Sequence, residues 1–163
     1  MKKVILIKYG ELSTKKANKN FFIKTLNEDI KKNLKDNVDI KYDFGRMFII
    51  PKNNNFDEVV KKLKNIFGIH EIIIAYKLEN KEIDTIKKSI IEMLNSINFK
   101  TFKVEVKRSD KKYPMDSMEF SRKIGGVILK GLGNVSVDVH NPDLLVNVEI
   151  RNNAVYIYFN GER

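Results

Sequence analysis

The sequence predicts an α+β protein made of two small consecutive domains, and two observations lead to this prediction. Short apolar or alternating segments, typical of strands, are interleaved with segments whose apolar residues recur every three or four positions, as in amphipathic helices. The elements read β-α-β-β-α-β in the first half of the chain and α-β-α-β-β-β in the second. We therefore expect one domain in residues 1–77 and another in residues 78–163.

The first half of the chain carries six predicted elements. Its opening strand contains the apolar run Val4–Ile7, which is too short for the core of a signal peptide. Apolar residues then recur every four positions from Phe22 to Leu34, which predicts an amphipathic helix. Gly68 is expected to end the second helix, because glycine favours the position just after one. The predicted strands are 2–9, 38–42, 47–50 and 69–76, and the predicted helices are 17–34 and 56–67.

This order of elements is that of the ferredoxin-like fold, in which two helices cover one face of a four-stranded antiparallel sheet. A short polar stretch at 78–81 precedes the second half. There, Asp116 with Glu119 three residues later is expected to cap a helix that Gly131 and Gly133 close. The other predicted elements are a helix at 83–97 and strands at 99–107, 135–139, 145–150 and 154–159.

Composition narrows the classes of function. The formal net charge of +10 and the pI of about 9.6 favour a polyanionic partner, nucleic acid before an anionic membrane. A lysine-rich proteome would give the same surplus without any function. Cysteine is absent and the two histidines, His70 and His140, lie far apart, so we expect no disulfide, thiolate or zinc site. No apolar run reaches transmembrane length, so we expect a cytoplasmic protein that does not bind membranes.

The most informative segment runs from Lys107 to Gly126 and reads KRSDKKYPMDSMEFSRKIGG. A basic strand end and loop, followed by a helix start with free N–H donors, suit a phosphate backbone. Gly126 leaves the helix backbone open to a phosphate or ribose, and Tyr113 is expected to stack on an unpaired base. The alternative is a solvated helix face in which Gly125 and Gly126 allow tight helix packing. The candidate RNA-binding residues are Lys107, Arg108, Lys111, Lys112, Arg122, Lys123, Gly125 and Gly126, with Asn141 in the loop that follows His140.

No catalytic motif competes with this segment. The glycines at 125, 126, 131 and 133 form neither a phosphate-binding P-loop nor a dinucleotide-binding fingerprint. The nearby acidic residues are expected to cap helices and pair with Lys111, Lys112 and Lys123, rather than to catalyse. These acidic residues are Asp110, Asp116, Glu119 and Asp143.

Five segments that span essentially all of the chain support a more specific reading. They are IKYGELSTKK near the start, Phe44–Gly45–Arg46, IFGI at 66–69, KRSDKKYPMDSMEFSRKIGG at 107–126 and HNPDLLVNVEIR at 140–151. Taken together and in this order, they resemble the N-terminal half of the tRNA 4-thiouridine synthetases. These enzymes are the tRNA uracil 4-sulfurtransferases that are also linked to thiamine biosynthesis.

The resemblance implies a ferredoxin-like domain followed by a THUMP domain, an RNA-binding module that holds the 3′ CCA end of tRNA in these enzymes. It implies this role for the candidate RNA-binding residues named above. It also implies ATP-dependent activation of uridine 8 and sulfur transfer from a cysteine desulfurase by a pyrophosphatase-type catalytic domain. We expect that domain to be absent here, and hence no catalytic residue and no ATP, Mg²⁺ or other cofactor in this chain.

The leading hypothesis is therefore a tRNA-binding module of a truncated synthetase. Its expected partners are tRNA, a catalytic domain or subunit, and a second copy of the chain in a homodimer. A stand-alone THUMP adaptor for a separate tRNA-modifying enzyme is an alternative. A small enzyme that acts on a phosphorylated metabolite is another, although no base–nucleophile pair is evident in the sequence.

Overall fold

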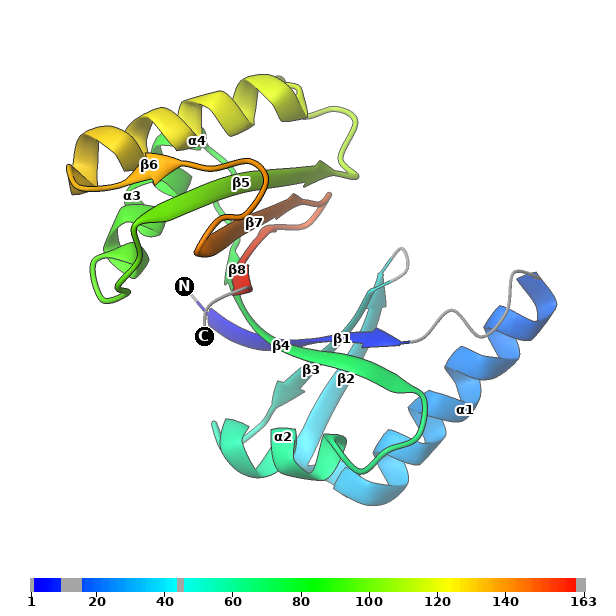
Figure 1. The fold of residues 1–163 in the computed structure, drawn as a ribbon. Coiled ribbons are helices and arrows are strands. Elements are labelled where there is room, and N and C mark those ends of the chain that lie inside the picture. Colours follow the sequence, from blue (N-terminus) through cyan, green and yellow to red (C-terminus); the bar gives the residue numbers. More distant parts are fainter. Residues whose placement is uncertain (1, 10–15, 44–45, 161–163) are drawn as a thin grey trace. The chain divides into compact units, whose positions relative to one another are not determined.

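The computed structural model describes residues 2–9, 16–43 and 46–160 and divides the chain into two compact units (Figure 1). The first unit extends from Lys3 to Ile74, and the second contains the residues from Ala75 onward. The division lies within strand β4 (Ile69–Leu78), which contributes residues to both units.

The first unit contains the predicted β-α-β-β-α-β order. Its strands form a sheet in the order β2-β3-β1-β4. Strand β3 pairs antiparallel with both β1 and β2, with Ile49 opposite Ile5 on one side and Ile40 on the other. The elements are β1 (Lys2–Tyr9), α1 (Lys16–Leu34), a 3₁₀ turn η1 (Lys35–Asn37), β2 (Val38–Asp43), β3 (Arg46–Pro51), α2 (Phe56–Leu63) and β4 (Ile69–Leu78). The ferredoxin-like prediction is confirmed.

The core of the first unit lies between this sheet and helices α1 and α2, which cover the same face (Figure 1). Because side chains alternate along a strand, Ile5 and Ile7 point to the same face of β1. The four-residue repeat of α1 supplies the opposite side of the core, as its spacing predicts. The buried members of this cluster are Ile5, Ile7, Leu26, Ile30, Leu34, Val38, Met47, Ile49, Val59, Leu63 and Ile66.

The second helix is shorter than the sequence indicates. It ends at Leu63, and residues 64–68 form a turn whose last residue is Gly68. Gly68 has a φ of +97°, and a Cβ at this position would lie 3.0 Å from the ring of Phe22. Phe67, which the sequence predicts to be the last residue of this helix, lies in the turn and is 86% exposed. The glycine thus shapes the turn into β4 and does not end the helix.

The second unit combines two helices with a sheet of mixed direction. Its strand order is β4-β8-β7-β5-β6, in which β5 runs parallel to β7 and β6, while β8 is antiparallel to β7 and β4. Strand β6 has only two residues, where the sequence predicts five. The elements are α3 (Ile83–Leu94), β5 (Thr101–Arg108), α4 (Ser117–Leu132), β6 (Ser136–Val137), β7 (Leu144–Ile150) and β8 (Val155–Asn160), and they occur in the predicted α-β-α-β-β-β order.

Helices α3 and α4 share one core with this sheet (Figure 1). Phe120, Ile124 and Ile128 are fully buried on α4, as their four-residue spacing predicts. The two helices approach closely at Gly131, where a Cβ would lie 2.9 Å from Cδ1 of Ile91. The helical glycine that allows close packing is therefore Gly131.

Candidate nucleic-acid interface

The basic segment begins where strand β5 leaves the sheet. Arg108 is the last residue of β5 and pairs with Ile150 of β7. The backbone N–H groups of Ser109 and Asp110 both donate to the carbonyl oxygen of Ile150, at 2.9 and 3.2 Å. The loop at 109–116 therefore starts from a fixed point at the end of an internal strand.

Arg108 is turned toward its own loop. Its Nη1 donates to the carbonyl oxygens of Tyr113 at 3.1 Å and of Lys111 at 3.5 Å. The guanidinium thus supports the loop backbone, which orders the segment that carries Lys111 and Lys112. The side chains of Lys107, Lys111 and Lys112 are exposed.

Tyr113 lies inside the unit. It is 9% exposed, and its ring packs edge-on against Phe120 with 5.9 Å between the ring centroids. Its hydroxyl donates to the carbonyl oxygen of Lys81 at 2.6 Å, and burial raises the pKa of this hydroxyl above its usual value. The predicted stacking of Tyr113 on an unpaired base is therefore wrong, because the ring is already part of the core.

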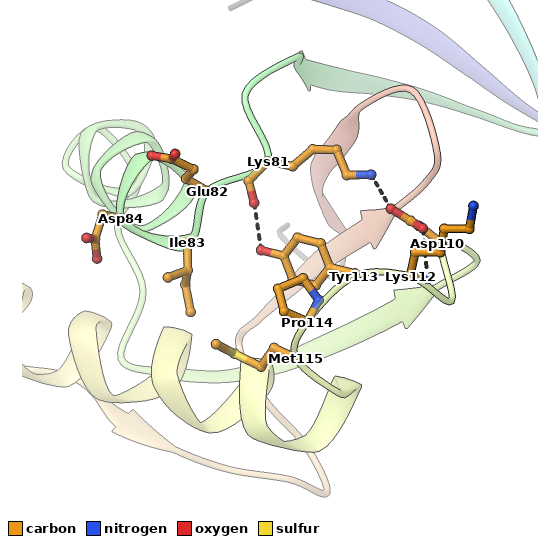
Figure 2. A pocket seen from close by; sticks show the side chains of 9 residues that line it. All are labelled: Lys81, Glu82, Ile83, Asp84, Asp110, Lys112, Tyr113, Pro114 and Met115. Carbon is orange, nitrogen blue, oxygen red and sulfur yellow. Dashed lines mark hydrogen bonds and ion pairs between the residues drawn. The ribbon is translucent and has the colours of Figure 1, made fainter.

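Asp110 joins the loop to distant parts of the chain. Its carboxylate accepts a hydrogen bond from Nζ of Lys81 and another from the backbone N–H of Lys112 at 3.1 Å (Figure 2). The same Nζ donates to the carbonyl oxygen of Asn152 at 3.2 Å. The hydrogen bond from Lys81, helped by that from Lys112, holds the pKa of Asp110 below its usual value. The sequence predicts Lys111 or Lys112 as the partner of Asp110, whereas the structure pairs it with Lys81, 29 residues away.

Two open hollows flank this loop. One has a volume of about 560 Å³ and brings the loop beside the start of α3 (Figure 2). The other, of about 510 Å³, lies between the loop and Asn152. Asp110 and Lys112 line both. The further lining residues are Lys81, Glu82, Ile83, Asp84, Tyr113, Pro114 and Met115 in the first hollow, and Ser109 and Lys111 in the second.

The start of helix α4 is capped by the chain itself. Oδ1 of Asp116 accepts a hydrogen bond from the backbone N–H of Glu119 at 2.8 Å, which confirms the predicted cap. A carboxylate therefore already occupies a position at which the sequence analysis expected a free N–H donor for phosphate.

The outer face of α4 combines cations with bare backbone. Arg122 and Lys123 are exposed, and Nζ of Lys123 lies 3.7 Å from Oε2 of Glu119. A Cβ at Gly125 or Gly126 would meet no atom within 4 Å. The alternative that these two glycines allow tight helix packing is therefore wrong. Two exposed apolar side chains, Met118 (75%) and Leu129 (42%), lie further along the helix surface.

Asn141 belongs to a different part of the unit. The backbone N–H groups of His140 and Asn141 each donate to Oδ1 of Asp138 at 3.0 Å, which lowers the pKa of that carboxyl. Asp143 accepts from the N–H groups of Lys100 and Thr101, at the beginning of β5. The eight-residue strand β5 places this loop roughly 23 Å from the basic loop at the other end. The candidate residues therefore lie at both ends of β5, with Asn141 separated from the loop lysines.

The acidic residues near the basic segment all have structural partners, but only the helix cap of Asp116 and the pairing of Glu119 with Lys123 are the predicted ones. Asp110, Asp116 and Asp143 accept backbone hydrogen bonds.

Among the residues that the structure describes, no three histidine, cysteine, aspartate or glutamate side chains gather as a metal site. Within the same residues, no helix is long and apolar enough to cross a bilayer. The segments IKYGELSTKK and Phe44–Gly45–Arg46 lie largely outside the described residues.

Two family models match the chain. The model of the ThiI ferredoxin-like domain matches residues 4–73, and that of the THUMP domain matches residues 80–160. The chain is 44% identical to a probable tRNA sulfurtransferase of Caldanaerobacter subterraneus over 94% of its residues, and 42% identical to one of Thermoanaerobacter pseudethanolicus over 97%. It spans 40% and 41% of the length of these two relatives.

Two solved structures are similar over 97% of the chain, each with a TM-score of 0.78. One is a 4-thiouridine synthetase in complex with RNA and bound ATP, at 31% identity and 41% of that chain. The other is a protein of Pyrococcus horikoshii Ot3, at 29% identity and 54% of that chain. These matches extend over both units.

Proposed function

Because the chain belongs to the family that joins a ThiI ferredoxin-like domain to a THUMP domain, we propose that it is a tRNA-binding module of a tRNA sulfurtransferase. Curated relatives over nearly the whole chain carry the name probable tRNA sulfurtransferase. The similar 4-thiouridine synthetase structure contains RNA. The net charge of +10 suits a polyanionic partner of this kind.

One observation carries this proposal: in the second unit, the basic loop and the outer face of the following helix α4 present exposed cations, and α4 adds open backbone. Lysine and arginine side chains there release counterions when they meet phosphates, which gives affinity without reading sequence. The open backbone at Gly125 and Gly126 lets a phosphate or ribose approach without a side chain in the way. The exposed residues proposed to contact phosphates are Lys107, Lys111, Lys112, Arg122 and Lys123. Asn141, at the other end of β5, is proposed as a more distant contact.

The bound part of the tRNA is proposed to be the acceptor stem with its 3′ CCA end. In the whole protein, binding of this part of the tRNA would position uridine 8 for ATP-dependent activation and sulfur transfer, with a cysteine desulfurase as the sulfur donor. We assign no catalytic residue to the two units. ATP and Mg²⁺ would belong with the remaining length of the relatives.

Titration with tRNA tests the proposal directly. Intact tRNA should bind more tightly than the same tRNA without its 3′ CCA. If roughly six phosphates are contacted, affinity should fall about 10³-fold between 50 and 200 mM salt. Equal affinity for both tRNAs would remove the acceptor end from the proposal, and binding that ignores salt would contradict a phosphate grip.

Charge reversal tests the helix face. Arg122→Glu with Lys123→Glu should weaken tRNA binding strongly and leave thermal stability nearly unchanged, because both side chains are exposed. Lys87→Glu with Lys88→Glu on α3 is a matched control, since it reverses two adjacent helix charges in the same unit. An equal loss of affinity in both double variants would show that overall charge, and not this face, governs binding.

A further inference from the structure

Lys81 lies where three segments of the second unit meet. Its side chain donates to Asp110 in the loop at 109–116 (Figure 2). It also donates to the carbonyl oxygen of Asn152, which follows β7. Its own carbonyl oxygen accepts the hydrogen bond of the Tyr113 hydroxyl at 2.6 Å. One residue of the polar stretch before α3 thus ties together the basic loop and the turn after β7.

Asp110 connects Lys81 to the part of the loop that carries Lys111 and Lys112. It is bonded to Lys81 on one side and to the backbone N–H of Lys112 on the other. Its carbonyl oxygen accepts the N–H of Tyr113 at 3.2 Å, which closes the loop on itself. The side chains of Lys81 and Asp110 are 22% and 12% exposed, so solvent screens their ion pair less than it screens surface pairs.

We propose that Lys81 is a positioning residue for RNA binding: through Asp110 and Asn152 it fixes the basic loop so that Lys111 and Lys112 meet phosphates in one conformation. This inference rests on the proposed function, because it requires the loop to contact RNA. Lys81 itself need not touch the RNA. It increases affinity by raising the fraction of molecules in which the loop is ready to bind.

Removing the charge of Asp110 distinguishes positioning by Lys81 from simple electrostatic attraction, because the two predict changes in RNA affinity of opposite sign. Removing the negative charge of Asp110 makes the loop more positive, so attraction to phosphates alone would tighten RNA binding. Positioning predicts the opposite, because the loop loses its tie to Lys81. If only a tenth of the molecules then hold the binding conformation, affinity falls about tenfold.

The decisive variant carries Lys81→Met together with Asp110→Asn. Its net charge equals that of the unchanged chain, because one cation and one anion are removed together. Methionine keeps an unbranched apolar side chain and removes the charged Nζ, which lies 5.9 Å from the centroid of the Tyr113 ring. We expect this double variant to bind an unmodified tRNA transcript about tenfold more weakly, whereas electrostatics alone predicts no change. Lys81→Arg, which keeps the charge and the donors, should bind within about twofold of the unchanged chain.

A matched control is available on β5. Lys103 and Glu105 form an exposed ion pair at 3.3 Å within a single strand, so this pair ties no segments together. Glu105→Gln removes one negative charge, as Asp110→Asn does, and should leave tRNA binding unchanged or slightly tighter. Asp110→Asn should weaken it. Tighter binding by Asp110→Asn, in step with the control, would overturn the inference.

The salt dependence distinguishes a change in loop population from a loss of phosphate contacts. Once the loop has adopted the binding conformation the same phosphates are contacted, so the double variant should bind more weakly with an unchanged slope of log affinity against log salt. A slope that is smaller in magnitude by roughly 1.5 would mean that Lys111 and Lys112 no longer contact phosphates in the complex, and would overturn the inference. All variants are compared well below their unfolding temperatures. If Lys81→Met fails to fold, the direction of the Asp110→Asn effect decides by itself.

This experiment also separates the inference from the proposed function. A lack of salt-dependent tRNA binding by the unchanged chain would refute the proposed function. Normal binding by the unchanged chain, with no loss in the charge-neutral double variant, would refute only the role of Lys81.

Discussion

The loop at 109–116 and the outer face of α4 carry similar charges but differ in how the fold holds them. The loop is bonded to the end of β7, to Lys81 and to the core through Tyr113. The helix face presents exposed Arg122 and Lys123, beside two glycines with open space around them. The loop therefore positions its lysines through buried contacts, whereas the helix face offers its groups directly to a partner.

This difference separates two kinds of mutational effect. Changes to the buried contacts of the loop should act first on folding stability, and on RNA binding only through the loop's conformation. Changes on the outer face of α4 should act on RNA binding and leave stability nearly unchanged.

The largest effect is expected at Tyr113. Tyr113→Ala removes a buried ring that packs on Phe120 and a hydroxyl bonded to Lys81, so it should lower the free energy of unfolding by about 3 kcal/mol. Tyr113→Phe removes only the hydrogen bond and should cost about 1 kcal/mol. Chemical denaturation measures both. A nearly neutral Tyr113→Ala would mean that the ring is not part of the core and would restore its stacking role.

The next effect concerns pH and Asp110. Its pKa is held below the usual value of 3.8, chiefly by Lys81, so its ionised form stabilises the fold above that pH. This contribution is lost as pH falls through the lower pKa of the folded state. Asp110→Asn should therefore lower the urea midpoint at pH 7, and the difference from the unchanged chain should disappear once the pH is low enough to protonate Asp110 in the folded state. A difference that persists in acid would show that the charge of Asp110 is not what holds the loop.

A smaller effect of opposite sign is expected at the glycines of α4. Gly125→Ala or Gly126→Ala should raise the free energy of unfolding by about 0.5–1 kcal/mol, because the added methyl meets open space in a helix interior. Gly131→Ala is the control and should gain less, because its methyl presses on Ile91. If RNA approaches the bare backbone, the two stabilised variants should also bind tRNA more weakly. Unchanged binding would remove the backbone patch from the interface.

The smallest effect is expected at Glu119. Its ion pair with Lys123 is exposed and spans one helical turn, so Glu119→Gln should change stability by only about 0.3 kcal/mol. The variant frees Lys123 and raises the local positive charge, so tRNA binding should tighten slightly at low salt. A matched titration at high salt should reduce this gain. A stability loss as large as that of Tyr113→Phe would contradict the exposed character of this face.

Patterns within one element were predictable from the sequence. The four-residue repeat of α1, the buried side of α4 and the Asp116 cap each depend on residues a few positions apart. The end of α2 was not predictable in this way. Phe67 continues the apolar spacing, but the chain leaves the helix after Leu63, and Phe67 is exposed.

Whether a side chain is buried, bonded or open to a partner depends on residues far away in the sequence. Tyr113 and Asp110 meet Lys81, which lies 32 and 29 residues away, and no local pattern links them. The same limit applies to glycines: the sequence offers Gly125, Gly126 and Gly131 on one helix, and only the position of Ile91 on α3 decides which of them packs closely.

The sequence by itself determined the order of elements, the two-part α+β organisation, the positive charge and the strand–loop–helix that carries it, because these depend on composition and on short-range periodicity. The tertiary structure alone decided which of these groups is available to a partner. In the folded chain Tyr113 is buried, Asp110 is bonded to Lys81, and Asn141 lies at the opposite end of β5 from the basic loop. The backbone at Gly125 and Gly126 is open. The physical reason is that burial and ion pairing are properties of segments that meet only when the chain folds.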